Sequence, residues 1–240
     1  MLADHATAIT QTGTFAGDLH LPDTARLKLI DFIAGELPRW RDHPDRPQAT
    51  ASETQLSEHL CDYLTGAARR SEGYDCFQFR TETTDEENKG RKIDLSIKPC
   101  GVAVWIEGRR HTQFEAIMPV ECKRLPTPPG RDRDEQEYVV VRDGSTGGIQ
   151  RFKFGHHGSR HAIAAMIAYI QEHDGVYWNN QIAAWISALV RQPNSEWSKS
   201  DLLSVVEFDS ANRLSRLCST HQRTGGRKPI HIHHLWAGMN

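Results

Sequence analysis

The apolar positions near the start of the chain repeat with the period of an α-helix. Between 24 and 38 they recur at spacings of three and four residues, which is typical of a helix that buries one face. They are Leu27, Ile30, Ala34 and Leu37, with Ile33 beside them. We predict that Pro38 ends this helix and that 39–50, with two prolines and mixed charge, is a connecting loop.

A second helix is predicted to begin after Ser52. Ser52 and Gln55 have the spacing of a capping box, in which the serine side chain accepts from the third helical amide and the glutamine reaches back. An apolar stripe follows at helical spacing, formed by Leu56, Leu60 and Leu64. Glu53 lies three residues before this stripe, so we expect its side chain on the buried face of the helix.

Between 74 and 125 the pattern changes from helical to alternating, which is typical of half-buried strands. The runs rich in β-branched or aromatic residues are 74–82, 92–98, 102–107 and 114–125. We interpret this region as three antiparallel strands, with polar turns between them. A further short strand is predicted over 137–142.

The last third of the chain contains longer apolar runs. The run 161–171 is apolar on nearly all sides, which favours a helix packed on a sheet face. The run 181–190 fits a second helix or a buried strand, because a short apolar run cannot be assigned by period alone. Strands are predicted at 204–208 and 229–236, with a basic turn between them.

Composition narrows the class of protein. The 240 residues carry a formal net charge of −2, so no global positive field indicates a nucleic-acid partner, although a local basic surface is enough to bind phosphates. No apolar run approaches the roughly 18 residues that cross a bilayer, and the first residues lack the apolar core of a secretory signal. The five cysteines are odd in number and scattered, which indicates reduced thiols in a cytoplasm.

Several common catalytic motifs are missing from the sequence. It contains no GxSxG elbow, no GxxxxGK[ST] loop and no GxGxxG fingerprint. This argues against an α/β hydrolase, a P-loop ATPase and a Rossmann oxidoreductase. If the protein acts with a motor ATPase or a regulatory subunit, that subunit is another chain.

The candidate chemistry lies in two of the predicted strands. Glu121 and Lys123 share one side of their strand because side chains alternate with period two, and Cys122 points to the other side. Asp94 lies in the middle of the strand at 92–98, where acidic residues are depleted. If the two strands pair, two carboxylates and one ammonium converge on one face. The alternative is a surface ion pair between Glu121 and Lys123 at a sheet edge.

Two converging carboxylates suit Mg²⁺, a hard cation that takes oxygen ligands and keeps several waters. Lys123 beside them could orient or deprotonate a metal-bound water, or neutralise charge on a phosphate. Glu53 is a candidate outer carboxylate for the same ion. Its alternative role is local, because Thr50 and Glu53 also have the spacing of a capping box.

These residues resemble the PD-(D/E)xK nuclease superfamily, which includes restriction endonucleases. Asp94, Glu121 and Lys123 match its motif, and Glu53 matches the helical acid that many members carry; Ile93 replaces the proline that often precedes the first acid. The resemblance spans roughly residues 50 to 172.

The resemblance implies an α/β fold with a central mixed sheet flanked by helices, arranged as a nuclease domain over 49–240 after an N-terminal helical segment over 1–48. It also implies a Mg²⁺-dependent endonuclease that hydrolyses DNA, with Mn²⁺ able to substitute. The backbone carbonyl of Cys122 would be a further metal ligand. A homodimer and a role in bacterial cytoplasmic defence are expected on the same ground.

The glycine-rich stretch from 147 to 161 is a candidate nucleic-acid contact. Arg151, Lys153 and Arg160 supply positive charge there, and the glycines allow close approach to a phosphate backbone. Gln150 and Arg151 could also reach the metal site. The alternatives are a solvated loop or an ordinary strand.

Two further interpretations stay open. His231 and His233 would share a strand face and could bind zinc, but no third ligand has a standard zinc-motif spacing, so packed or surface histidines are the simpler interpretation. The alternative functions are a catalytically inactive partner or nucleic-acid-binding subunit with this fold, and an RNA phosphodiesterase using the same site.

Overall fold

The computed structural model describes residues 18–85, 87, 89–130, 133–142 and 144–240. Its centre is a seven-stranded sheet with the order β2-β3-β6-β7-β10-β9-β8. The strands of this sheet are β2 (Phe77–Thr84), β3 (Lys92–Pro99), β6 (Met118–Leu125), β7 (Ile163–Ile170), β8 (Ser204–Asp209), β9 (Leu214–His221) and β10 (Ile230–Gly238).

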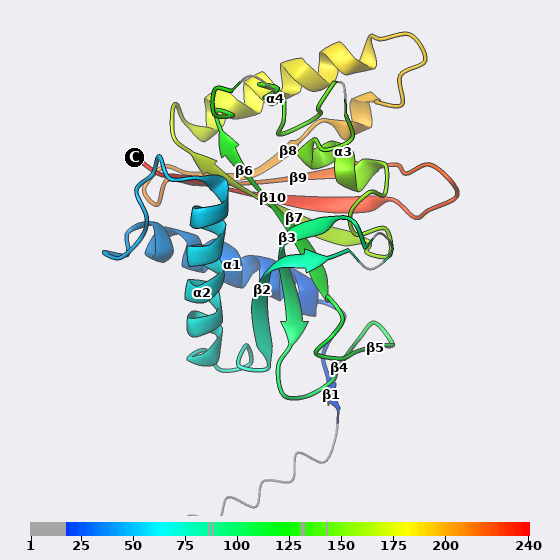
Figure 1. Cartoon of the computed structure of the whole chain (residues 1–240). Helices are drawn as coiled ribbons and strands as arrows, with labels where there is room; N and C mark the ends of the chain where they lie inside the picture. The colour runs from blue at the N-terminus through cyan, green and yellow to red at the C-terminus, as the bar shows by residue number, and fades with distance from the viewer. Residues whose placement is uncertain (1–17, 86, 88, 131–132, 143) are drawn as a thin grey trace, which may run out of the picture.

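Helices cover both faces of the sheet (Figure 1). The helices α1 (Ala25–Arg41) and α2 (Glu53–Arg69) pack on one face, and α3 (Gly148–Lys153) and α4 (Gly175–Val190) pack on the other. A smaller sheet contains β1 (Leu19–His20), β4 (Val104–Ile106) and β5 (Arg109–His111), and a single 3₁₀ turn, η1, spans Lys199–Asp201. The predicted α/β class with a central mixed sheet and flanking helices is confirmed.

The strand directions place the two candidate strands side by side. β2, β3 and β6 form an antiparallel meander, β6 runs parallel to β7 after the crossover through α3, and β7 runs parallel to β10. β10, β9 and β8 then continue in antiparallel pairing. The three antiparallel strands predicted from the alternating pattern are therefore β2, β3 and β6, whereas the run 102–107 contributes β4 to the smaller sheet.

The run 161–171 is a strand and not a helix, so that prediction is wrong. Alternate residues of β7 enter two separate hydrophobic cores: Ala165 and Ile167 pack with α1 and α2, while Ala164 and Met166 pack with α3 and α4. A central strand that is buried on both faces has no polar side, so it lacks the alternation by which a strand is recognised. The run 181–190, which was ambiguous by pattern, lies in α4.

Two smaller predictions also differ from the structure. The segment 137–142 forms turns in place of a strand, since its backbone folds back through hydrogen bonds from Val139 and Val140 to the carbonyl of Gln136. α1 continues past Pro38 to Arg41, because Trp40 in the added turn is fully buried in the core. Residues 1–17 of the predicted N-terminal segment lie outside the described residues.

The start of α2 is fixed by the predicted capping box. Ser52 Oγ accepts a hydrogen bond from the Gln55 amide at 3.2 Å, and Gln55 Oε1 accepts from the Ser52 amide at 3.2 Å. Leu56, Leu60 and the rest of the stripe are buried against the sheet. Because the cap sets where the helix begins, it places Glu53 in the first turn, next to the candidate strands. No helix in the described part of the chain is long and apolar enough to cross a membrane.

Two histidines are buried near the smaller sheet. His111 Nε2 lies 3.4 Å from an Arg26 nitrogen. Burial, together with the charges of Arg109 and Arg26, lowers the pKa of His111 to about 4 and that of His161 to about 3. Both imidazoles therefore stay neutral in the folded protein at pH values where an unfolded chain protonates them.

These histidines predict an acid-dependent loss of stability. Unfolded histidine binds its proton near pH 6.5, so the unfolded state takes up more protons as the pH falls. The stability that these groups contribute is fully present above that pH and declines toward the folded pKa values of about 4 and 3. The slope is about 1.4 kcal/mol per pH unit for each histidine.

Urea unfolding between pH 5 and pH 8 measures this slope. His111→Gln is expected to reduce the slope of stability against pH below pH 6.5, by up to the contribution of one proton. His231→Gln, which alters an exposed histidine, is the matched control. Equal slopes for both variants and the parent would contradict the assignment.

Candidate active site

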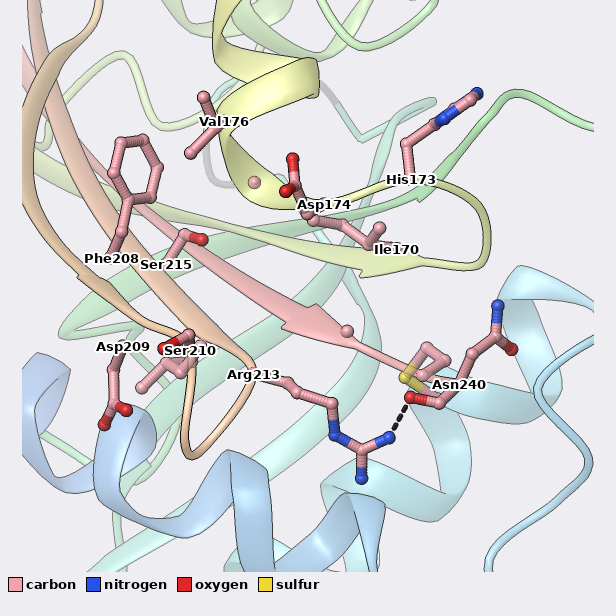
Figure 2. A pocket seen from close by; sticks show the side chains of 14 residues that line it. Ile170, His173, Asp174, Val176, Phe208, Asp209, Ser210, Arg213, Ser215 and Asn240 are labelled. Carbon is pink, nitrogen blue, oxygen red and sulfur yellow. Dashed lines mark hydrogen bonds between the residues drawn. The ribbon is translucent and has the colours of Figure 1, made fainter.

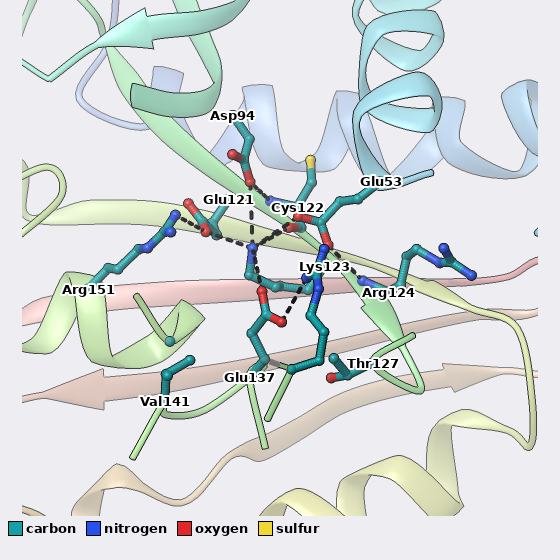
Figure 3. A network of polar contacts seen from close by, with 12 residues as sticks. Glu53, Asp94, Glu121, Cys122, Lys123, Arg124, Thr127, Glu137, Val141 and Arg151 are labelled. Carbon is teal, nitrogen blue, oxygen red and sulfur yellow. Dashed lines mark hydrogen bonds and ion pairs between the residues drawn. The ribbon is translucent and has the colours of Figure 1, made fainter. Parts of the chain in front are cut away.

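One buried ammonium group organises the candidate site. Lys123 Nζ lies 2.9 Å from Glu121 Oε1, 3.1 Å from Glu53 Oε1 and 3.9 Å from Asp94 Oδ2. A fourth carboxylate, Glu137, lies 3.9 Å away, and the lysine side chain is only 5% exposed. Figure 3 shows these acids pointing toward Lys123 from different segments of the chain.

The sheet register explains why the acids meet. Leu95 of β3 pairs with Val120 of β6 in antiparallel register, so the next residues along, Asp94 and Glu121, lie opposite each other. Asp94 Oδ2 accepts a hydrogen bond from the Cys122 amide at 2.8 Å. The period of two then places the side chain of Lys123 on the same face as that of Glu121. The structure therefore brings together the residues that the motif predicted from two separate strands.

Glu53 reaches the site from the first turn of α2. Besides its ion pair with Lys123, its Oε2 accepts a hydrogen bond from the Arg124 amide at 3.2 Å. The carboxylate thus bridges α2 and β6. The capping role that Thr50 suggested belongs to Ser52 instead, which leaves Glu53 directed at the site.

The charged groups in this cluster shift one another's pKa values, some upward and some downward. Burial and then the charge of Glu121 raise the pKa of Asp94 to about 7, against the attraction of Lys123. Burial also raises the pKa of Glu121, but Lys123, His157 and Arg151 outweigh it and lower that pKa to about 2. Glu121, Glu53 and Asp94 raise the pKa of Lys123 well above its ordinary value, although burial lowers it. Glu121 and Lys123 are therefore ionised at neutral pH, and Asp94 is the carboxyl poised near neutrality.

Glu121 is the most enclosed of the acids. Its side chain has no exposed surface, and Arg151 donates to its Oε1 at 2.6 Å. Its other oxygen, Oε2, lies 3.3 Å from Nδ1 of His157 but accepts no hydrogen bond. A buried carboxylate oxygen without a donor is costly, because its solvation is lost and not replaced. His157 is the positive partner that this oxygen faces when the imidazole is protonated, and it helps to lower the pKa of Glu121.

The four predicted residues of the glycine-rich stretch lie in different surroundings. Arg151 reaches the acidic cluster. Gln150 is buried and does not reach the cluster, because its side chain closes the start of α3 by accepting from the Gly147 and Val141 amides. Arg160 is at the surface, paired with Glu87 at 3.3 Å.

Lys153 is not placed for contact with nucleic acid, so that expectation is corrected. Its side chain is 3% exposed and its Nζ lies 3.0 Å from Asp201 Oδ1 in the second core. The same Asp201 oxygen lies 2.7 Å from His221, and Lys153 also stands over the ring of Trp197. Residues Gly148–Lys153 of this stretch form α3, so Lys153 and Arg151 point in different directions.

Two residues of the site were missed by sequence reasoning. Glu137 lies in a segment predicted as a strand, and only the turn geometry brings it to Lys123, while Arg133 holds it at 2.9 Å. His157 had a sequence signal, since it lies in the glycine-rich stretch, but its contact with Glu121 depends on the α3 crossover.

The oxygen donors of this cluster are of the type that a hard divalent cation takes, although their arrangement in the described part of the chain is not that of a metal site. Carboxylate oxygens from Asp94, Glu121 and Glu53, with the Cys122 carbonyl, form an oxygen-rich set of the kind that Mg²⁺ prefers. A pocket of about 40 Å³ opens beside Asp94 and Glu53, which is room for more than one water. Lys123 stands among the carboxylates and also donates to the Cys122 carbonyl at 3.0 Å. Within the described residues, no group of three or more His, Cys, Asp or Glu side chains has metal-binding geometry.

A separate pocket of about 240 Å³ lies between the start of α4 and the β8–β9 hairpin (Figure 2). Its lining is formed by residues such as Ile170, Phe208 and Met239, and Arg213 donates to the backbone oxygen of Asn240 beside it. None of the predicted site residues lines it. The acidic cluster is therefore the stronger candidate for chemistry.

Comparisons of the chain with protein-family models, with curated proteins and with solved structures find no match. The functional interpretation of the site therefore depends on its own geometry.

The position of Lys153 predicts a structural role for this residue. Lys153→Met is expected to lower the free energy of unfolding by about 3 kcal/mol, because it leaves Asp201 as a buried charge without its cation. The matched control is Lys199→Met, which alters an exposed lysine of η1 and should change stability by less than about 0.5 kcal/mol. Chemical denaturation measures both, and equal stabilities would refute the structural role.

Proposed function

We propose that the protein is a Mg²⁺-dependent endonuclease that hydrolyses phosphodiester bonds of DNA. The observation that carries the proposal is the meeting of Asp94, Glu121 and Lys123 from adjacent strands, with Glu53 reaching them from α2. This is the placement that the resemblance to the PD-(D/E)xK superfamily implies. The order of the elements, in which a helix bearing an acid precedes the two strands and a helix follows them, supports the same assignment.

The carboxylates of Asp94 and Glu121 would hold the ion, with Glu53 and the Cys122 carbonyl as further ligands. The bound ion supplies charge that polarises a scissile phosphate and lowers the pKa of a coordinated water. Mn²⁺ has similar ligand preferences and would substitute. Glu121 supports this role because its low pKa keeps it ionised at neutral pH.

The remaining side chains of the site have roles toward water and phosphate. Lys123 lies among the proposed ligands, and its three donors face Glu121, Glu53 and the Cys122 carbonyl; it would position the attacking water once the ion takes over one of these acceptors. Arg151 uses one terminal nitrogen on Glu121, so its other donors can bind a phosphate oxygen. Both groups would stabilise the negative charge that develops as the phosphodiester bond breaks.

One observation favours a second candidate function, a catalytically inactive subunit that binds nucleic acid or another protein. Lys123 already neutralises the carboxylates, and the described residues contain no group of three with metal-binding geometry. In an inactive subunit the lysine would hold the place of the ion permanently. An RNA phosphodiesterase using the same residues is the third candidate.

The cellular location and the assembly of the protein are part of the same proposal. All five cysteines are free thiols, which supports a cytoplasmic location and is compatible with a role in bacterial defence. We also propose that the chain acts as a homodimer, since cutting a duplex requires two strand cleavages. A separate ATPase or regulatory subunit would be another chain.

The activity is tested with plasmid, linear duplex, single-stranded DNA and RNA, each with Mg²⁺, Mn²⁺ or a chelator. We expect metal-dependent cleavage of DNA, and Asp94→Asn should reduce it by more than about a hundredfold because a ligand carboxylate is lost. The variant should remain folded and be as stable as the parent or more so, since it removes one of several crowded negative charges.

The control for that variant is Asp62→Asn, an exposed acid on α2 that should cleave like the parent. Calorimetry with Mn²⁺ separates the first two candidates. The nuclease should bind Mn²⁺ at a site that is lost in Asp94→Asn, whereas an inactive subunit should show no such binding. Full activity of Asp94→Asn would remove this residue from the mechanism. Cleavage of RNA alone would favour the third candidate.

The oligomeric state is measured independently of activity. Light scattering of the purified chain should give about twice the mass of 27.2 kDa. A monomer that remains a monomer when bound to duplex DNA would contradict the proposed dimer.

A further inference from the structure

Three loops that are distant in sequence are joined next to the acidic site. They are the described part of the β2–β3 loop (Asp85, Glu87 and 89–91), the loop 155–161 after α3, and the loop 222–228 between β9 and β10. The buried Arg223 joins the last two loops, because it donates to the carbonyls of Gly158 at 3.2 Å and Ser159 at 2.9 Å.

The first loop is attached to the same junction. Asp85 is buried, and its Oδ2 accepts a hydrogen bond from the Gly158 amide at 3.1 Å. The glycine therefore bonds to both neighbouring loops, through its carbonyl and through its amide. Backbone groups held by buried charged side chains form a rigid support, since charge-assisted hydrogen bonds are the stronger kind.

Cations gather on the outer side of this junction. Arg160, Arg227 and Lys228 are exposed, and Arg91 is half-buried. The guanidinium of Arg227 lies against Gly155, where a side chain would come within 3.1 Å of its nitrogen. Gly155 has a φ of 69°, a backbone conformation that favours glycine.

These cations act together electrostatically. After burial, the charges of Arg91, His157, Arg227 and Arg151 lower the pKa of His156, so the arginines lie within range of one imidazole. Arg151 belongs to this group and also contacts Glu121, which makes the basic loops continuous with the site. Figure 1 shows the β9–β10 turn, the end of α3 and the β2–β3 turn at the same end of the sheet.

Few acids oppose this charge among the described residues. Glu87 pairs with Arg160 at 3.3 Å, and both side chains are well exposed. Such a surface pair is worth little, so a phosphate can replace the carboxylate. Within the part of the chain that the structure describes, Arg227 makes no hydrogen bond or ion pair of its own. Glu87 lies within electrostatic range of Arg227 as well as of Arg160, but an exposed guanidinium that makes no direct hydrogen bond favours an anion as its ligand.

We propose that Arg91, Arg160, Arg227 and Lys228 form a surface that binds the phosphate backbone of duplex DNA beside the acidic site. This inference rests on the proposed function, and it assigns the DNA contact to loops outside the catalytic motif. Arg227 is its central residue because its guanidinium, on the β9–β10 turn, lies against Gly155 in the loop after α3. Binding through phosphates positions a duplex without reading its sequence. The surface would therefore guide DNA toward Arg151 independently of base sequence.

The salt dependence of binding tests the proposal. The full chain is titrated with a fluorescent duplex in Ca²⁺ or in a chelator, so that cleavage does not interfere, and Kd is measured over a range of KCl concentrations. Each lost phosphate contact reduces the slope of log K against log salt by about one. We expect Arg227→Ala to show this reduction, with binding about tenfold weaker at moderate salt. Arg227→Lys should retain most of the slope.

The matched control is Lys28→Ala, which removes an exposed cation from α1 on the opposite face of the sheet. Arg227→Ala and Arg91→Ala each alter a residue outside the cores, and circular dichroism checks that they fold. If the wild type binds duplex and Arg227→Ala has the same Kd and slope as Lys28→Ala, the inference is overturned while the proposed function stands. If the wild type binds neither duplex nor metal, both are overturned. Tighter binding of RNA or single strands than of duplex would reject duplex DNA as the ligand of this surface.

Discussion

The structure around the candidate site depends on one constraint, the neutralisation of a buried ammonium group. Taking Lys123 out of water costs several kcal/mol unless opposite charges surround it. Glu121, Glu53 and Asp94 supply that charge from β6, α2 and β3, so the lysine ties two strands and a helix together. Burial and then the charges of Glu121 and Glu53 raise the pKa of Asp94, against the attraction of Lys123.

The sequence allowed prediction of those parts of this cluster that depend on local rules. The period of two placed Glu121 and Lys123 on one face, and the capping box of Ser52 located Glu53 at the start of its helix. Asp94, an acidic residue in the middle of a predicted strand, indicated that this strand carries a further part of the site. Each of these signals needs only a few adjacent residues, and for that reason each could be read without a structure.

The missed features are those that depend on the whole fold. β7 was interpreted as a helix because residues such as Ala164 and Ala165 enter different cores, so burial on both faces removed the alternation. Lys153 has the sequence signal of a phosphate contact, and only its pairing with Asp201, which is distant in sequence, gives it a structural role. Glu137 and His157 reach the site through a turn and a crossover whose paths no local pattern records.

The short helix α3 links the site to the second core, and its beginning shows how tightly the two are joined. A side chain on Gly147 would come within 2.4 Å of Val140, and one on Gly148 within 2.5 Å of Met166 on β7. Only glycines allow the helix to wedge between the 137–141 turn and the sheet. That wedge holds Glu137 on one side and projects Arg151 toward Glu121 on the other, while Lys153, one half-turn later, is anchored in the core. Arg151 is therefore held by a helix fixed at both ends, so its guanidinium is pre-organised toward the acids and does not depend on a substrate to bring it there.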